Sequence, residues 1–170
     1  MKQTQGGRTA VPAGPPDAVK KFLQLSVILT GFDEDFLRGT GMLQTYYDEL
    51  LRIIGAREAG ELFGAFDRVA DGDDTQLRKV VLNNHRYGPI ARNVMTMWYL
   101  GMWTQLPRKW RDKYGATSDD TDHVVSAAAY RESLVWPAAG THPMSAKAPG
   151  FGTWAKASAT PGASGTEAHS

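Results

Sequence analysis

The sequence predicts an all-α domain, a compact bundle of about five to six helices with irregular ends. Apolar residues recur at helical spacing through residues 17–136, and no segment alternates apolar and polar residues as a half-buried strand does. Glycine and proline gather at both ends of the chain. The expected organisation is a flexible leader (1–16), a helical domain (17–136), an extended aromatic arm (137–157) and a disordered tail (158–170).

Glycines separate the helices expected in the first half of the chain. Asp17 is a favourable N-cap for a helix that ends at Gly31. A second helix is predicted over residues 33–54, where Gly55 stops it. A third follows over residues 56–71, with its apolar side chains on one stripe.

The second half contains the predicted centre of the bundle. Pro89 is well placed as the first residue of a helix over 89–103, which follows a short helix capped by Asp73 or Asp74. The helix over 89–103 is apolar almost all round, which is typical of a buried central helix. We therefore predict that it forms the core hub, carried by three residues: Trp98, Tyr99 and Gly101.

The remaining segments are predicted to be a connector, a loop and a last helix. Residues 106–114 form a basic connector that contains a tryptophan, and residues 115–122 form a polar loop. The last helix is expected over residues 123–136. No strand is expected anywhere.

Composition excludes several function classes. The chain has 19 basic and 18 acidic residues and a formal charge of +1, which gives no reason to expect binding to nucleic acid. The absence of cysteine excludes disulfides, thiolate metal sites, covalent haem attachment and a cysteine nucleophile. The most apolar run, residues 89–103, is shorter than the ~20 residues that span a bilayer, so no direct membrane insertion is expected.

Two motifs suggest a ligand but lack required residues. The stretch "ADGDDTQL" resembles a calcium loop, yet Gln76 and Leu82 stand where the glycine and the bidentate glutamate are needed. The stretch "RGTGM" follows no strand, which argues against dinucleotide binding. The histidines are isolated from one another, so no metal site is predicted: His85, His123, His142 and His169.

The charged side chains are expected to be solvated surface. The carboxylates of the second and third predicted helices fall between apolar stripes, where a charge is usually exposed: Asp48, Glu49, Glu58, Glu61 and Asp67. The basic stretch "RKWRDK", residues 108–113, could bind an anion, but Asp112 interrupts it. No catalytic, cofactor-binding or metal-binding residue is therefore predicted, and the chain is not expected to be an enzyme by itself.

The aromatic residues of the C-terminal arm remain to be explained. The arm is too rich in proline and glycine to fold alone, and tryptophan is enriched at the energetic centres of protein interfaces. We predict that the arm contacts a partner protein, while packing against the chain's own core stays open. The predicted interface residues are Trp136, Pro137, Pro149, Gly150, Phe151 and Trp154.

Four stretches resemble a known family. They are "FLQLSVILTGFD", "MWYLG", "SLVW" at the end of the last predicted helix, and "PGFGTW" in the arm. Together they resemble the small, gamma-type subunit of membrane-bound FAD-dependent sugar and polyol dehydrogenase complexes, the sorbitol, fructose and glucose dehydrogenase type. The resemblance spans roughly residues 21–157.

The resemblance implies a non-catalytic subunit. In that family a large glucose-methanol-choline type flavoprotein binds FAD and oxidises the sugar or alcohol, and the small subunit supports its maturation and stability. A multihaem cytochrome c subunit often completes the complex. This chain would hold no cofactor itself.

Three features depart from the family pattern. The chain lacks a twin-arginine leader, its stretch "THPMSAKA" lacks the cysteine that family members often have there, and Gly152 and Thr153 separate Phe151 from Trp154. With no export signal, the chain as given is expected in the cytoplasm, or in a periplasmic membrane-associated complex if it is exported with its partner.

Two other interpretations stay open. One is a stand-alone helical enzyme or ligand-binding protein with a pocket around Trp98, Tyr99 and Trp103. The other is a helical adaptor unrelated to flavin chemistry.

Overall fold

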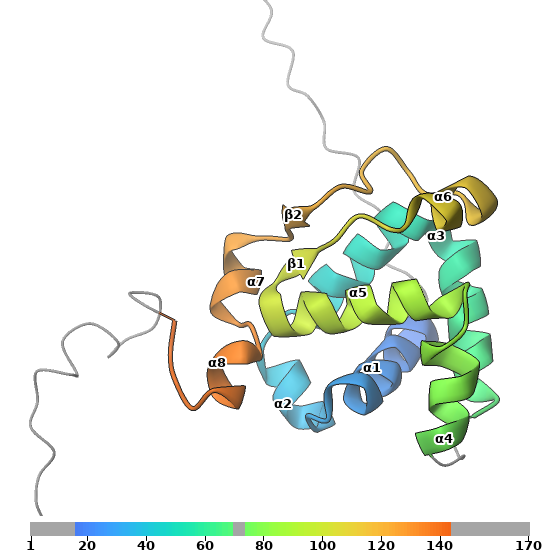
Figure 1. Cartoon of the computed structure of the whole chain (residues 1–170). Helices are drawn as coiled ribbons and strands as arrows, with labels where there is room; N and C mark the ends of the chain where they lie inside the picture. Colours follow the sequence, from blue (N-terminus) through green and yellow to red (C-terminus); the bar gives the residue numbers. More distant parts are fainter. Residues whose placement is uncertain (1–15, 70–73, 144–170) are drawn as a thin grey trace, which may run out of the picture.

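The computed structural model describes residues 16–69 and 74–143, apart from the side chains of Pro16, Asp74 and Arg78. The leader up to residue 15, and the arm and tail from residue 144, lie outside the described residues. Helices make up most of the described chain, so the all-α prediction is confirmed (Figure 1).

Helix α1 (Pro16–Thr30) begins at Pro16, so the predicted N-cap Asp17 lies inside its first turn. Capping interactions are found at the end of α1 and at the start of α2 (Glu34–Gly39). Helix α1 ends at Gly31, whose positive φ of 76° lets its N–H reach the Val27 carbonyl at 2.9 Å. Helix α2 begins at Asp33, whose carboxylate accepts the Phe36 N–H at 2.7 Å.

The prediction of a single helix over residues 33–54 is wrong, because this range contains two helices. The chain leaves α2 at Thr40, turns through Gly41 at φ 70°, and starts α3 (Leu43–Asp67). Gly41 adopts a left-handed conformation that interrupts the helix at little steric cost. The break expected at Gly55 exists as a kink with φ 79° and ψ 161°, after which α3 continues.

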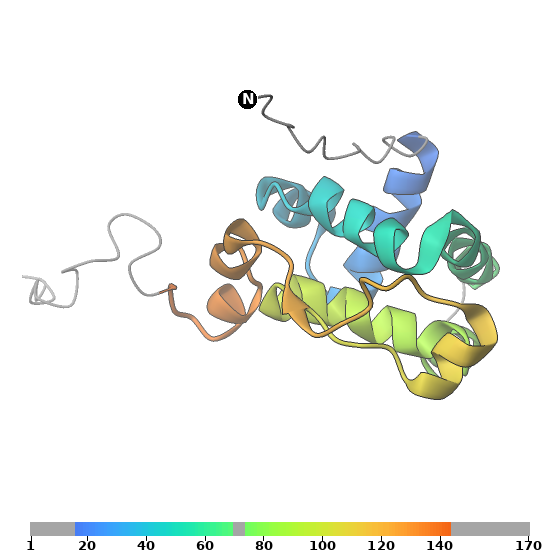
Figure 2. The same ribbon diagram turned by 90° about the horizontal axis from the view of Figure 1, so that it is seen from above.

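Helix α5 forms the centre of the described chain. It follows α4 (Asp74–Leu77) and the π-helical turn η1 (Arg78–Leu82), and it extends over Tyr87–Leu100. Figures 1 and 2 show α5 crossing the molecule, and it contacts α1, α3, η1 and α7. The helix ends before residue 103 because Gly101 adopts the left-handed conformation as its C-cap.

A two-stranded ladder follows α5, so the expectation of no strand is wrong here. Strands β1 (Met102–Trp103) and β2 (His123–Val124) pair antiparallel, with Met102 opposite Val124 and Trp103 opposite His123. Helix α6 (Arg108–Tyr114) lies between them in the chain. It occupies most of the segment predicted as a connector.

The last predicted helix, residues 123–136, is replaced by β2 and two short helices, α7 (Ala127–Arg131) and α8 (Val135–Ala138). The Ser126 hydroxyl caps α7 by accepting the Ala129 N–H at 3.0 Å. The Leu134 N–H donates instead to the Trp98 carbonyl at 2.9 Å, which ties the chain to the end of α5 rather than continuing α7. Pro137 lies in α8 rather than opening an extended arm, since the first turn of a helix tolerates a missing N–H.

Trp98 lies in the middle of the core and is fully buried. Its ring meets the Tyr46 ring edge-on at a centroid distance of 4.8 Å, and its indole N–H donates to the Ser26 hydroxyl at 2.9 Å. Burial raises the pKa of the Tyr46 hydroxyl, which has no hydrogen-bond partner among the described residues. Tyr99 is only partly buried and donates from its hydroxyl to the Thr30 carbonyl at 2.7 Å.

Replacing Gly101 with alanine is expected to lower the free energy of unfolding by about 3 kcal/mol, through a left-handed backbone and a steric clash. A Cβ at this position would lie 2.7 Å from the backbone carbonyl of Ala129. Gly31→Ala is the matched control, because Gly31 also has a positive φ but nothing lies within 4 Å of its Cβ position. Chemical denaturation should show a loss of about 1 kcal/mol for the control. Equal losses of unfolding free energy for Gly101→Ala and Gly31→Ala would contradict the predicted clash with the backbone of α7.

Candidate functional site

The exposed large apolar side chains of the described residues belong to elements that meet at one end of the molecule. They come from the last turn of α1, from α2, from the last turn of α5, from β2 and from α7. The residues are Ile28, Phe36, Leu100, Val124 and Tyr130, each 42–52% exposed. We call this set the apolar end; α2, α7 and the last turn of α5, which carry Phe36, Tyr130 and Leu100, lie on the left in Figure 1.

Hydrogen bonds and ring contacts hold the elements of the apolar end together. Phe32, which follows α1, contacts the Tyr99 ring on α5 at a centroid distance of 6.3 Å and the Phe36 ring on α2 at 5.0 Å. At the end of α5, the Gly101 carbonyl accepts the Val125 N–H at 2.9 Å. These contacts give the exposed apolar side chains a fixed framework.

Trp136 and Pro137 are the two predicted interface residues within the described chain, and both lie in α8 beside the apolar end. The Trp136 ring packs edge-on against Tyr130 at 5.5 Å, and its indole N–H donates to the Tyr130 carbonyl at 2.9 Å. The other four predicted interface residues lie outside the described residues: Pro149, Gly150, Phe151 and Trp154.

A groove of about 430 Å³ opens between α2 and α8. Phe36, Trp136, Pro137 and Pro143 form its apolar lining, and Pro143 is the last described residue of the chain. The described part of the chain therefore ends in the wall of this groove. The sequence could not place α2 beside α8, because the two helices are far apart along the chain.

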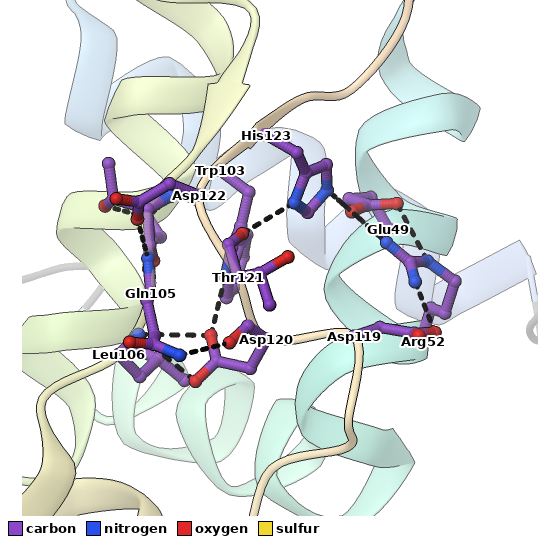
Figure 3. A network of polar contacts seen from close by, with 12 residues as sticks. Glu49, Arg52, Trp103, Gln105, Leu106, Asp119, Asp120, Thr121, Asp122 and His123 are labelled. Atoms are coloured by element: carbon purple, nitrogen blue, oxygen red, sulfur yellow. Dashed lines mark hydrogen bonds and ion pairs between the residues drawn. The ribbon is translucent and has the colours of Figure 1, made fainter.

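A network of polar contacts attaches the loop before β2 to α3 (Figure 3). Arg52 pairs with Glu49 at 2.5 Å and also with Asp119. The two ring nitrogens of His123 face acceptors, the Glu49 carboxylate at 2.6 Å and the Thr121 carbonyl at 2.6 Å. Glu49 was expected to be solvated surface, and this is wrong, because β2 returns to α3 in the folded chain and brings His123 to the Glu49 carboxylate.

The network connects the loop before β2 to α3. Each ring nitrogen of His123 lies within hydrogen-bonding distance of a neighbouring oxygen, and Nε2 also lies 3.4 Å from Arg52 Nη2. These contacts fix the position of the loop against α3.

Asp120 is a second polar group of this loop that the sequence did not single out. Its buried carboxylate accepts the Trp103 indole N–H at 2.9 Å and the Leu106 backbone N–H at 3.1 Å. The guanidinium of Arg111 lies 3.7 Å away. Asp120 thus anchors β1 and the chain after it, and Trp103 is a core residue.

Glu58 was expected on a solvated face, and this is wrong because its side chain is only 2% exposed. Two parallel hydrogen bonds join it to Arg86, at 2.8 Å and 3.0 Å. The bonds from Arg86 hold the pKa of the Glu58 carboxyl below its ordinary value, and burial acts in the opposite direction. The pair connects α3 to the turn before α5.

The alternative interpretation places a pocket around Trp98, Tyr99 and Trp103. Trp98 and Trp103 are fully buried, and each indole donates to a neighbouring side chain. Within residues 16–69 and 74–143, no group of three or more acidic or histidine side chains could hold a metal ion. None of the described helices is long and apolar enough to span a bilayer.

Comparisons of the chain with protein-family models, with curated proteins and with solved structures find no match.

Proposed function

We propose that this chain is the non-catalytic small subunit of an FAD-dependent sugar or alcohol dehydrogenase complex. Its role would be to bind a large glucose-methanol-choline type flavoprotein and to support the maturation and stability of that partner. FAD would be bound by the partner, and a multihaem cytochrome c could complete the complex. The resemblance of the four sequence stretches is the starting point for this proposal.

The observation that carries the proposal is the apolar end. Five large apolar side chains there are each at least 42% exposed, and burying such side chains against a partner is favourable at roughly 25 cal/mol per Å² of apolar surface. Apolar side chains that form a contiguous exposed patch are typical of interaction sites, and we propose that these five side chains act together in this way. Phe151 and Trp154 follow in the sequence after Pro143, the last described residue, which lines the groove between α2 and α8.

The packing of Trp136 refines the division between domain and arm. Its indole is bonded to Tyr130, and the Thr141 N–H donates to its carbonyl at 2.9 Å. Residues up to Pro143 therefore belong with the helical domain. The segment proposed to reach the partner begins at residue 144.

The test is co-expression with a large flavoprotein of the glucose-methanol-choline type. Deleting residues 144–170 should leave the helical circular dichroism nearly unchanged, since no described contact is removed, and should weaken co-purification at least tenfold. Flavin absorbance of the purified partner should fall when the chain is omitted. Equal flavin occupancy with and without this chain would contradict the maturation role.

A surface variant tests the apolar end separately from the arm. Leu100→Lys places a charge in the apolar end at a helix C-terminus, where a cation is tolerated. It should weaken co-purification at least tenfold. Thr75→Lys on α4, at the opposite side of Figure 1, is the matched control and should bind normally. If Leu100→Lys and Thr75→Lys both bound the flavoprotein normally, the apolar end would not be part of the interface.

A further inference from the structure

A second groove, of about 550 Å³, lies between the turn that precedes α5 and the helix α6. Its basic lining comes from both sides: His85 and Arg92 from the α5 side, and Lys109 and Lys113 from α6. Pro89, Pro107 and Tyr114 add apolar surface. No Asp or Glu is among the described residues that line this basic groove.

The arrangement of α6 explains how a mixed-charge segment produces a purely basic face. Lys109 and Lys113 are four residues apart and share one side of the helix. Arg108 and Asp112 have the same spacing on another side and pair with each other at 3.7 Å. Asp112, which interrupts the basic run in the sequence, therefore does not neutralise the two groove lysines.

The positive charges of the basic groove are not balanced within the described chain. Among the side chains that the structure describes, no carboxylate pairs with Arg92, Lys109 or Lys113. Arg86, just outside the groove, shows the contrast, because Glu58 neutralises it. Three uncompensated cations facing one hollow favour an anionic ligand.

The walls of the basic groove are held in place before any ligand arrives. The Trp110 indole N–H donates to the Arg86 carbonyl at 2.7 Å, which fixes α6 against the turn before α5. The Asn84 side-chain oxygen accepts the Arg86 N–H at 2.8 Å. Arg92 donates from Nη1 to the Leu82 carbonyl at 3.2 Å, which orients its guanidinium. Preorganised donors reduce the entropic cost of binding.

We propose that the basic groove binds a small phosphorylated molecule. Arg92, Lys109 and Lys113 would contact the phosphate, which carries close to two negative charges at neutral pH. The proline and tyrosine surfaces would contact the organic part. A volume of about 550 Å³ exceeds that of a bare phosphate and lies in the range of small-molecule sites. This site is separate from the apolar end and does not depend on the proposed subunit role.

The experiment titrates the full-length, ¹⁵N-labelled chain with sodium pyrophosphate and with phenyl phosphate, using phenol as the uncharged counterpart. We expect saturable amide shift changes at residues 83–85 and 109–114, and weaker binding in 200 mM than in 20 mM NaCl because salt screens exposed charges. Phenol should bind at least tenfold more weakly than phenyl phosphate. Shift changes that do not saturate, or that spread over lysines far from the groove, would overturn the proposal.

Two double variants remove equal charge from different places. Lys109→Gln/Lys113→Gln should weaken phenyl phosphate binding at least tenfold. Lys20→Gln/Arg131→Gln removes two exposed cations from α1 and α7 and should change binding less than twofold. Equal losses would indicate non-specific attraction. If a polyglutamate peptide binds the groove while both phosphates fail, its ligand is an acidic protein segment and the proposal is wrong.

Discussion

Replacing Trp98 with alanine is expected to lower the free energy of unfolding by about 3–5 kcal/mol. The fully buried indole contacts the Tyr46 ring, and its loss would leave a cavity in the centre of the core. The substitution would also leave the Ser26 hydroxyl, itself buried, without the N–H that it accepts. Thermal unfolding followed by circular dichroism should show a melting temperature lower by roughly 10–20 °C.

Two further variants separate the origins of this loss. Leu100→Ala, in the same helix but 47% exposed, should cost no more than about 0.5 kcal/mol. Trp98→Phe keeps a ring in the core but removes the bond to Ser26, so its cost should fall between those of Leu100→Ala and Trp98→Ala. A melting temperature unchanged by Trp98→Ala would show that α5 is not the centre of the fold.

The periodicity of apolar residues predicted the all-α class, because each long helix buries a stripe of apolar side chains. The spacing of these residues can be recognised within the sequence of the helix itself. This periodicity did not predict the break between α2 and α3. The stretch around Gly39 and Gly41 continues the apolar pattern, and only the left-handed conformation of Gly41 separates α2 from α3. Strands β1 and β2 have two residues each, which is too short to show an alternating pattern.

The errors about charged residues have a different physical cause. Glu58 and Glu49 lie on helical faces that look polar in the sequence, but each is covered by a cation or a histidine from a distant segment. The pairing of Glu58 with Arg86 depends on how α3 packs against the turn before α5, which helical spacing does not encode.

The candidate interaction surface was only partly predictable for the same reason. Trp136 and Pro137 were singled out because proline- and glycine-rich sequence follows them. Phe36, Leu100 and Val124 carry no such signal. Their exposure depends on how α2, the end of α5 and β2 pack in the folded chain. Single side chains of this kind are recognisable only in the folded arrangement.

The second large effect is expected at Glu58. Glu58→Gln should lower the free energy of unfolding at pH 7 by about 3 kcal/mol, the lower end of the range for breaking a buried pair. We expect a loss at the lower end of this range because Arg86 would keep two other ways to stabilise its charge. Its side chain is 26% exposed to solvent, and it lies 3.4 Å from the carboxylate of Glu61. Glu34→Gln breaks the exposed pair with Arg38 and serves as control; it should cost less than about 1 kcal/mol.

The pH dependence of this loss tests its electrostatic origin. The hydrogen bonds from Arg86 lower the pKa of the Glu58 carboxyl in the folded chain below its ordinary value of 4.5. The folded state therefore binds fewer protons there than the unfolded state, so the pair stabilises the fold fully above pH 4.5. That contribution is lost as the pH falls through the lowered pKa. Urea denaturation at several pH values should show the difference between wild type and Glu58→Gln constant from pH 7 to about 5.5 and shrinking below 4.5. A difference that stays constant down to pH 3.5 would mean that the loss comes from altered packing rather than from the carboxylate charge.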